Sequence, residues 1–347
     1  MGDPGRVIVA GASGYAGALA AELVHRHPSL ELMAATARSD VGTPLTELYP
    51  QYTAPVALRE LDLDEIEDAD AAIVAYPHGA SAPVVAAMRG LGLKVVDLSA
   101  DFRLRDLPTY ERWYGPHGEP DLLDGAVYGL TELNREAIAG AELVANPGCY
   151  PTATLLALAP LAEAGLIEDV VIDAKSGVSG AGRGAAEPME VIKRTDDSKA
   201  YKAGAHRHTP EIVQELTALA ARGASANEAL PVTFVPHLMP FDQGELVSCY
   251  VRTSRPVDDP ELKVLYGAAG ATEGLYAGER FVEMRADPPG VAEVRDTNLC
   301  RICVVADPDV SRVMAFAAID NLWKGAASQA VQNLNLILGL PEGEGIP

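Results

Sequence analysis

The chain has 347 residues, of which 48% are hydrophobic and 22% are charged, so neither a disordered nor a fibrous protein is expected. Its length allows two hydrophobic cores, because single cores stop growing at about 250–300 residues. The 49 acidic and 27 basic residues give a net charge of −22, which repels nucleic acids and anionic lipids. We therefore expect neither nucleic acid nor a membrane as a partner, and an anionic ligand would need a locally basic pocket.

Four cysteines, Cys149, Cys249, Cys300 and Cys303, are too few for a disulfide framework and favour a reducing compartment. Cys300 and Cys303 have the spacing of half a zinc site, but no second ligand pair is near them in the sequence. We expect buried strand cysteines and no metal. The first residues lack a cationic n-region and no apolar run reaches about 18 residues, so neither a signal peptide nor a spanning helix is expected. A cytoplasmic protein is predicted.

Strands and helices alternate over roughly the first 145 residues, which is the pattern of a doubly wound parallel sheet. Apolar, β-branched runs predict strands at 6–10, 30–36, 71–75, 94–98 and 143–146. Segments rich in Ala and Leu predict helices from about Gly14 to His27 and over 80–91. We therefore predict an α/β, Rossmann-type dinucleotide-binding domain over residues 1–148.

The character of the sequence changes after Cys149. Helices are predicted over 152–164 and 210–222, the second with Thr209 as its N-cap. Strands are predicted at 170–175, 231–235, 245–253, 281–284 and 299–306. These elements favour a catalytic and dimerisation domain of the α+β class with a mixed sheet, over 149–316. A long amphipathic helix over 317–338 is expected to return to the first domain, which then includes residues 317–347.

A glycine-rich turn, GASGYAG at 11–17, follows the first strand. Bare backbone N–H groups beside a helix N-terminus bind a pyrophosphate, and glycines allow its close approach. The spacing departs from the usual Gly-x-Gly-x-x-Gly, so a simple strand–helix turn is the alternative. The position of the turn favours a dinucleotide site, whose expected contacts are Gly11, Ser13, Gly14, Tyr15 and Gly17.

The end of the second strand distinguishes NAD from NADP(H). An NAD site usually has Asp or Glu about 20 residues beyond the glycines. This chain has Thr36, Arg38 and Ser39 there, and Asp40 comes one position too late. A cation and two hydroxyls suit the 2′-phosphate of NADP(H), which is the predicted cofactor. An exposed loop arginine is the alternative interpretation.

Residues 146–152, Asn-Pro-Gly-Cys-Tyr-Pro-Thr, place Cys149 where a strand ends and a helix begins. Unpaired N–H groups there stabilise a thiolate, so Cys149 is a candidate nucleophile, with an inert buried cysteine as the alternative. A nucleophile needs a base, and His206 and His208 precede a predicted helix. His208 is favoured because Glu211 is near enough to orient its imidazole, whereas a surface or capping histidine is the alternative.

Basic residues supply the remaining candidates. Arg103 follows a strand at the end where ligands bind, and it could hold a phosphate or carboxylate. The glycine-rich run at 176–183 is a candidate anion cradle. Several cations cluster after it, at Lys193, Arg194, Lys199, Lys202 and Arg207. Some of these are expected to serve only solubility.

These segments, together with Pro77-His78-Gly79 and the run DNLWKG at 320–325, occur in an order that resembles the family of N-acetyl-γ-glutamyl-phosphate reductases. That family belongs to the aspartate-semialdehyde dehydrogenase superfamily. The resemblance covers nearly the whole chain, and the Cys149 segment with HRHTPE at 206–211 is its specific part. Trp323 and Ser328 depart from the family pattern, away from the expected chemistry.

The resemblance implies NADPH-dependent reduction of an acyl phosphate to an aldehyde, with release of inorganic phosphate, in arginine biosynthesis. Cys149 would form a thioester and His208 would act as acid and base. Substrate contacts are expected from Arg103, Ser176, Arg183, His206 and Glu211. Further cofactor contacts are expected from Pro77, Gly79, Gly177 and Asn321.

Three alternatives to this reductase remain. An aspartate-semialdehyde dehydrogenase, or the carrier-protein-linked reductase of the lysine pathway, would share much of the Cys149 segment. A dinucleotide-binding regulator is disfavoured, because it would need neither Cys149 nor the segment 206–211. The superfamily implies a homodimer or homotetramer, and the sequence leaves open whether His206 or His208 faces the thiol.

Overall fold

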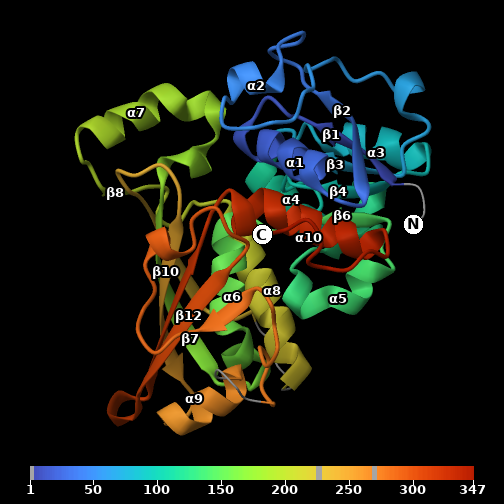
Figure 1. Ribbon diagram of the computed structural model, residues 1–347. Coiled ribbons are helices and arrows are strands. Elements are labelled where there is room, and N and C mark those ends of the chain that lie inside the picture. The colour runs from blue at the N-terminus through green and yellow to red at the C-terminus, as the bar shows by residue number, and fades with distance from the viewer. Residues whose placement is uncertain (1–3, 224–228, 268–271) are drawn as a thin grey trace. The chain divides into compact units, whose positions relative to one another are not determined.

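The computed structural model describes residues 4–223, 229–267 and 272–347, and the chain forms two compact units (Figure 1). The first unit comprises Met1–Gly148 with Ala326–Pro347, and the second comprises Cys149–Gly325. Each unit has its own sheet.

The first unit is built on a six-stranded sheet in the order β2-β1-β3-β4-β6-β5, in which every strand pair is parallel. Its strands are β1 (Gly5–Ala10), β2 (Leu30–Thr36), β3 (Ala71–Val74), β4 (Lys94–Asp97), β5 (Ala126–Tyr128) and β6 (Leu143–Ala145). Its helices are α1 (Tyr15–Arg26), α2 (Leu45–Leu48), α3 (Ala82–Gly90), α4 (Leu107–Tyr114), α5 (Thr131–Ala139) and α10 (Ser328–Ile337). All four residues of β3 are buried, as expected for a parallel strand covered on both faces.

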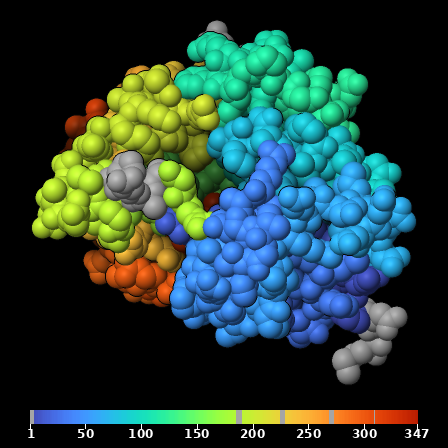
Figure 2. All heavy atoms as spheres, turned by 90° about the horizontal axis from the view of Figure 1, so that it is seen from above, coloured from blue at the N-terminus to red at the C-terminus, as the bar shows by residue number. Residues whose placement is uncertain are grey.

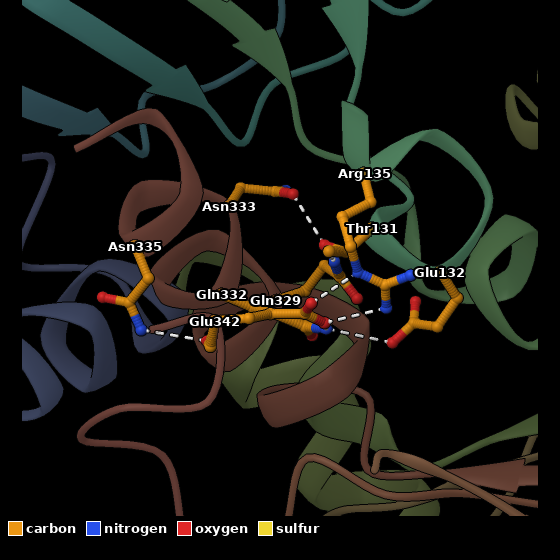
Figure 3. Close-up of polar contacts among 8 residues, drawn as sticks. All are labelled: Thr131, Glu132, Arg135, Gln329, Gln332, Asn333, Asn335 and Glu342. Carbon is orange, nitrogen blue, oxygen red and sulfur yellow. Dashed lines mark hydrogen bonds and ion pairs between the residues drawn. The ribbon is translucent and has the colours of Figure 1, made fainter. Parts of the chain in front are cut away.

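Helix α10 is held in the first unit by buried polar side chains (Figure 3). Thr131 Oγ1 donates to Asn333 Oδ1 at 2.8 Å and accepts from Gln329 Nε2 at 2.5 Å. Gln332 Nε2 donates to Glu132 Oε1 at 3.0 Å. Such groups are costly to bury unless they are bonded, so this network fixes how α10 packs on α5.

The same helix also fixes the end of β6. Asn333 Nδ2 donates to Asn146 Oδ1 at 3.0 Å and to the carbonyl of Gly129 at 2.8 Å. Asn146 Nδ2 donates in turn to the carbonyl of Ala326 at 3.2 Å. A β-carbon at Gly129 would lie 2.6 Å from Asn333 Nδ2, so glycine is required there. The turn that leads toward the cysteine segment is therefore rigid at Asn146.

The second unit is built on a seven-stranded sheet in the order β11-β12-β13-β10-β7-β9-β8. Its strands are β7 (Ile167–Ser176), β8 (Lys199–Ala200), β9 (Val232–Leu238), β10 (Glu245–Thr253), β11 (Val282–Met284), β12 (Cys300–Asp307) and β13 (Arg312–Ile319). The β7–β9 and β11–β12 pairs are parallel, and the other pairs are antiparallel. This is the mixed sheet expected, and the predicted fold class is confirmed.

The second unit also contains helices, one of which is a central apolar helix. They are α6 (Cys149–Glu163), α7 (Ala186–Arg194), α8 (His208–Gly223) and α9 (Asp259–Tyr266). Helix α6 packs against α8 and against β10 and β13, and residues 150–162 are all buried. Because α6 is apolar all round, it is fixed on every side, and the position of its first residue is fixed with it.

Two helix predictions are corrected by the structure. The predicted helix 317–338 begins too early, because residues 312–319 form β13, paired along its whole length with β10. A π-helical turn (Trp323–Ala327) then leads into α10. The alanines of this segment favour a helix, but pairing with neighbouring strands outweighs that local preference. Helix α8 begins at His208, and Thr209 Oγ1 is buried without a hydrogen bond, so Thr209 is not its N-cap.

The cysteines of β12 behave as expected for strand residues. Cys300 and Cys303 are both buried, and neither forms a disulfide. Their odd spacing places them on opposite faces of the strand, so they cannot hold one metal ion together. Within residues 4–223, 229–267 and 272–347, no helix has the length and apolarity needed to cross a bilayer.

Candidate active site

Cys149 is the first residue of α6, and its side chain is partly buried. No acidic residue lies in the first turn of the helix. The N-terminus of a helix has unsatisfied N–H groups and a positive partial charge, both of which favour a thiolate over a thiol. Pro151 is tolerated because a proline in the first turn removes no helical hydrogen bond. This position makes Cys149 a candidate for an activated nucleophile.

Two further residues of the second unit border Cys149. A β-carbon on Gly325 would lie 2.8 Å from the β-carbon of Cys149, so the backbone at 325 packs directly on the cysteine. The carboxyl group of Glu245, the first residue of β10, interacts with the Cys149 side chain and is completely buried. Burial raises the pKa of Glu245 to about 8.

His206 is committed to contacts that make it a poor base. Its Nδ1 accepts a hydrogen bond from the backbone N–H of His208 at 3.1 Å, so the proton is on Nε2, which lies 3.4 Å from Tyr201 Oη. Burial, together with the positive charges of Lys202 and Arg207, lowers the pKa of His206 to about 4. A neutral imidazole whose acceptor nitrogen is occupied cannot take a proton readily.

His208 lies at the start of α8, and its ring is 4.9 Å from that of His206, centroid to centroid. Tyr150, Tyr201 and Phe234 complete the aromatic group around the two imidazoles. Burial raises the pKa of both tyrosines, so their hydroxyls stay neutral. Of the two histidines, His208 is therefore the better candidate for the acid and base.

Glu211 lies in the first turn of α8 and is 1% exposed. It is thus buried within the second unit on the helix that begins with His208. Arg183 lies in the 3₁₀ turn Arg183–Ala185, in the connection between β7 and α7.

The first backbone N–H groups of the run 176–183 are bonded within the protein. The backbone N–H groups of Gly177, Val178 and Ser179 donate to the carbonyls of Gly244, Phe241 and Asp242, at 2.9–3.0 Å. A β-carbon on Gly177 would lie 2.5 Å from the Asp242 carbonyl oxygen, so this glycine serves close packing of two loops. These three donors are therefore engaged and would not hold an anion in this conformation.

Ser176 and Asn321 support the same pair of loops. Ser176 is buried, and its hydroxyl donates to the carbonyl of Gly177 at 3.1 Å. Asn321 Oδ1 accepts from the Gly244 N–H at 2.7 Å, and its Nδ2 donates to Ser179 Oγ at 2.9 Å. Both side chains are thus hydrogen-bonded inside the second unit, and their expected ligand contacts stay predictions.

The basic cluster after residue 190 is partly neutralised. Lys193 forms ion pairs with Glu190 and Asp242, at 2.9 and 2.7 Å. The other members, Arg194, Lys199, Lys202 and Arg207, are exposed.

In the first unit, the glycine turn has the geometry of a pyrophosphate site. The N–H groups of Gly11 and Ala12 donate to the Thr36 carbonyl, which ties the turn to β2. A β-carbon on Gly17 would lie 2.3 Å from the Gly11 oxygen, so Gly17 allows α1 to approach β1. A β-carbon on Gly14 would meet nothing closer than 3.7 Å, which leaves the start of α1 open to a ligand.

The residues after β2 divide into exposed and buried. Arg38 and Ser39 are exposed. The N-terminal part of the chain, to which they belong, forms the blue area of the surface in Figure 2. The Arg38 guanidinium carbon lies 4.8 Å above the ring of Tyr76, and Ser39 Oγ is 3.1 Å from Ser13 Oγ. Thr36 differs from the expectation, because its side chain is fully buried and only its carbonyl contacts the glycine turn.

The turns after β3 and β4 meet through Asp101. Its carboxylate accepts from the N–H groups of Gly79, Ser81 and Ala82, at 2.7–3.2 Å, and so caps α3. Pro77 and Gly79 therefore lie at the carboxyl edge of the sheet, next to the switch point between β1 and β3.

Arg103 is 5% exposed, and two of its guanidinium nitrogens bond to backbone carbonyls. Nε donates to the Asn146 carbonyl at 2.8 Å and one terminal nitrogen donates to the Leu98 carbonyl at 2.7 Å. These bonds join the ends of β6 and β4. The expected role of Arg103 as a ligand clamp stays a prediction.

Sequence reasoning missed Glu245, Gly325 and Asp97. Burial raises the pKa of Asp97, at the end of β4, to about 6, although Ser81 and Ser99 both donate to it. Glu245 carried no signal, because a lone glutamate opening an apolar strand resembles a surface residue. Gly325 belonged to a recognised run, but its contact with Cys149 depends on the fold.

Each of the two units resembles a domain of known proteins. Residues 6–141 match the family model of a semialdehyde dehydrogenase NAD binding domain, and residues 149–321 match that of a semialdehyde dehydrogenase dimerisation domain. Aspartate semialdehyde dehydrogenase II from Vibrio cholerae superposes with a TM-score of 0.72 at 19% identity, over 97% of this chain and 99% of that one. The enzyme from Candida albicans, solved with NADP, gives 0.64 at 16% identity, over 97% and 99%. At these identities the likeness shows a shared fold.

Curated relatives are much more similar in sequence. The N-acetyl-γ-glutamyl-phosphate reductase of Desulforudis audaxviator is 47% identical, over 98% of this chain and 97% of its own. That of Geobacter sulfurreducens is 44% identical over the same shares of the two chains. With this identity along almost its entire length, the chain belongs to the family of N-acetyl-γ-glutamyl-phosphate reductases.

Proposed function

We propose that this enzyme reduces N-acetyl-γ-glutamyl phosphate to N-acetylglutamate semialdehyde and inorganic phosphate, with NADPH, in arginine biosynthesis. The names of the curated relatives favour this substrate over an aspartyl or carrier-linked acyl phosphate. The observation that carries the proposal is Cys149 at the first position of α6, in the same unit as a histidine pair of which one member is unsuited to be the base.

Cys149 attacks the carbonyl carbon of the acyl phosphate. A carbon–sulfur bond forms, the bond to the phosphate oxygen breaks, and phosphate leaves with the electron pair. The N-terminus of α6 lowers the cost of the thiolate before attack. His208 accepts the thiol proton and later returns a proton when the carbon–sulfur bond breaks. An acyl phosphate is already activated, so a stabilised thiolate and exclusion of water supply most of the catalysis.

NADPH, when bound, supplies the hydride that reduces the thioester. The residues of the first unit suit this cofactor. The open α-carbon of Gly14 and the N-terminus of α1 accommodate a pyrophosphate, and exposed Arg38 and Ser39 suit a 2′-phosphate. Gly11, Gly17, Pro77 and Gly79 shape the same edge of the sheet.

The two units then have separate roles. We assign cofactor binding to the first unit, including its C-terminal segment from Ala326, and covalent chemistry to the second. Arg183, beyond the end of β7, is the proposed contact for the negative groups of the substrate, with His206 and Glu211 beside the base.

We also propose a homodimer formed through the second unit. Val171 of β7 and Tyr250 of β10 are register partners on neighbouring strands and lie on the same face of the sheet. Their side chains are 40% and 37% exposed. Asp173, Lys175 and His237 provide polar groups on the same face. An apolar patch with a polar rim is typical of an interface between subunits.

A reduced, cytoplasmic location would keep the Cys149 thiolate active.

The test of the proposed function is the reverse reaction. The purified enzyme is given N-acetylglutamate semialdehyde, NADP and phosphate, and NADPH formation is followed by absorbance. Parallel assays use aspartate semialdehyde and use NAD. The proposal requires a strong preference for N-acetylglutamate semialdehyde with NADP. Equal or better turnover of aspartate semialdehyde would show that the substrate assignment is wrong.

A further inference from the structure

Glu245 is a buried carboxyl group beside the nucleophile that the proposed function does not use. It opens β10, where its register partners are Ser176 of β7 and Ile319 of β13. Its exposed fraction is 0%, and it shares a strand face with Val247, which is also fully buried. That face packs against α6, whose first residue is Cys149. A charged residue type is rarely placed in such a position unless it is paired.

The two titratable side chains that act most on the ionisation of this carboxyl group are Cys149 and Asp320, and neither is a cation. Neither carboxylate oxygen has a well-aligned hydrogen bond, and the nearby group that favours the ionised form is the Cys149 side chain. The other titratable groups that interact with Glu245 are Asp320, Tyr150 and Tyr201. Lys175 is one residue from Ser176 on β7 and so belongs to the opposite face of the sheet.

These surroundings determine which form is stable. Desolvation opposes the carboxylate, and the negative charge of Asp320 opposes it as well. A thiolate at Cys149 would oppose it further, because two like charges in contact cannot both form without a large penalty. Glu245 and Cys149 therefore carry at most one negative charge between them near neutral pH.

We propose that Glu245 is the proton-sharing partner of Cys149: protonated, it donates a hydrogen bond to the thiolate, and ionised, it suppresses the thiolate by charge repulsion. This inference rests on the proposed role of Cys149 as nucleophile. The sharing moves one proton between sulfur and oxygen, with no change in oxidation state. The hydrogen bond from protonated Glu245 stabilises the thiolate in addition to the helix N-terminus. This stabilisation is lost at high pH, where Glu245 ionises.

The inference predicts two steps in the reactivity of the thiol. After the pair has lost its first proton, the remaining proton is shared between sulfur and oxygen. Only part of the enzyme then carries a thiolate at Cys149. The second proton is lost at higher pH, where both groups become charged. A neutral amide at position 245 can still donate to the thiolate but cannot ionise. In Glu245→Gln the upper step should therefore disappear.

The experiment measures alkylation of Cys149 by iodoacetamide between pH 5 and pH 10, with mass spectrometry of the cysteine peptide. Cys149→Ser gives the background, and Glu283→Gln on β11 is the matched control for loss of a carboxyl group elsewhere in the unit. The wild type and Glu283→Gln should show two-step profiles. Glu245→Gln should show one step, with a midpoint at least one pH unit below the upper step of the wild type. Identical profiles in the wild type and Glu245→Gln would overturn the inference.

A second measurement does not depend on the variant folding. In the wild-type chain, the side-chain carboxyl carbon of Glu245 is followed by ¹³C NMR before and after Cys149 is alkylated. Removing the titrating sulfur should move the Glu245 midpoint, and an unchanged midpoint contradicts the inference. Alkylation needs neither substrate nor cofactor, so either result is independent of the semialdehyde assay. Failure of that assay with an intact two-step profile would reject the proposed function and leave the proton sharing standing.

Discussion

Gly325 and Cys149 are in direct contact, since a β-carbon at position 325 would lie 2.8 Å from the β-carbon of Cys149 and 3.3 Å from its α-carbon. The two residues are the last and the first of the second unit. The close approach fixes the nucleophile from outside its own helix. A glycine is required here for space, because no side chain fits between the two backbones.

Gly325→Ala should displace Cys149 and lower kcat/KM about 100-fold, because a shift of about 1 Å in a reacting group has that effect. Steady-state assays in the reverse direction measure it. Gly90→Ala, on α3 with open space around it, is the matched control and should leave activity unchanged. Wild-type activity in Gly325→Ala would mean that the cysteine position is not critical.

Cys149→Ser should lose turnover by at least about a thousandfold, because a serine hydroxyl at a helix N-terminus is a much weaker nucleophile than a thiolate. Binding of NADP, measured by fluorescence titration, should stay within about twofold of the wild type, since the glycine turn belongs to the other unit. Substantial residual reductase activity would rule out the thioester mechanism.

Arg38→Asp should lower the ratio of kcat/KM for NADP to that for NAD by about 10- to 100-fold, the worth of a charge-assisted hydrogen bond to a phosphate. Arg38→Lys keeps the cation and should retain most of the preference, although it loses the flat contact with Tyr76. If Arg38→Asp leaves the ratio unchanged, Arg38 does not contact the 2′-phosphate.

Gly14→Ala and Gly17→Ala separate ligand space from packing. A methyl group at Gly14 has room, so the variant should fold normally but bind NADP at least about tenfold more weakly. A methyl group at Gly17 would lie 2.3 Å from the Gly11 oxygen, so that variant should unfold at lower temperature. Thermal unfolding without cofactor, together with NADP titration, measures both. Unaltered NADP affinity in Gly14→Ala would place the pyrophosphate elsewhere.

Glu245 should make stability depend on pH. Its pKa in the folded chain, about 8, lies above its ordinary value of 4.5, so the folded state binds the proton more tightly and loses stability as pH rises from about 4.5 to 8. A tenfold difference in proton affinity between the folded and unfolded chain corresponds to about 1.4 kcal/mol. Glu245→Gln removes this loss. The free energy of unfolding of the variant, relative to that of the wild type, should therefore rise by about a few kcal/mol between pH 5 and pH 8. Urea titrations at both pH values measure it, and a pH-independent difference would contradict the assignment.

Local sequence signals predicted the parts of this fold that local physics controls. The β-branched runs and glycine turn of the first unit reappear as β1, β2 and α1, because these elements bury their own apolar residues. The short strand β5 and helices α4 and α5 were not predicted, since polar residues and short lengths hide them. The segment 312–319 shows the opposite failure, in which partners on β10 and β12 override an apparent helix.

The candidate site divides in the same way. The sequence by itself determined that Cys149 opens a helix and that Gly14 opens another, because capping and turn chemistry are encoded within a few residues. The tertiary structure adds that Arg103 and Gly177 bond to backbone carbonyls far along the chain, that Nδ1 of His206 accepts a hydrogen bond, and that Glu245 interacts with the Cys149 side chain. The physical reason is that desolvation and hydrogen-bond pairing depend on residues distant in the chain, and no local pattern records which of them will meet.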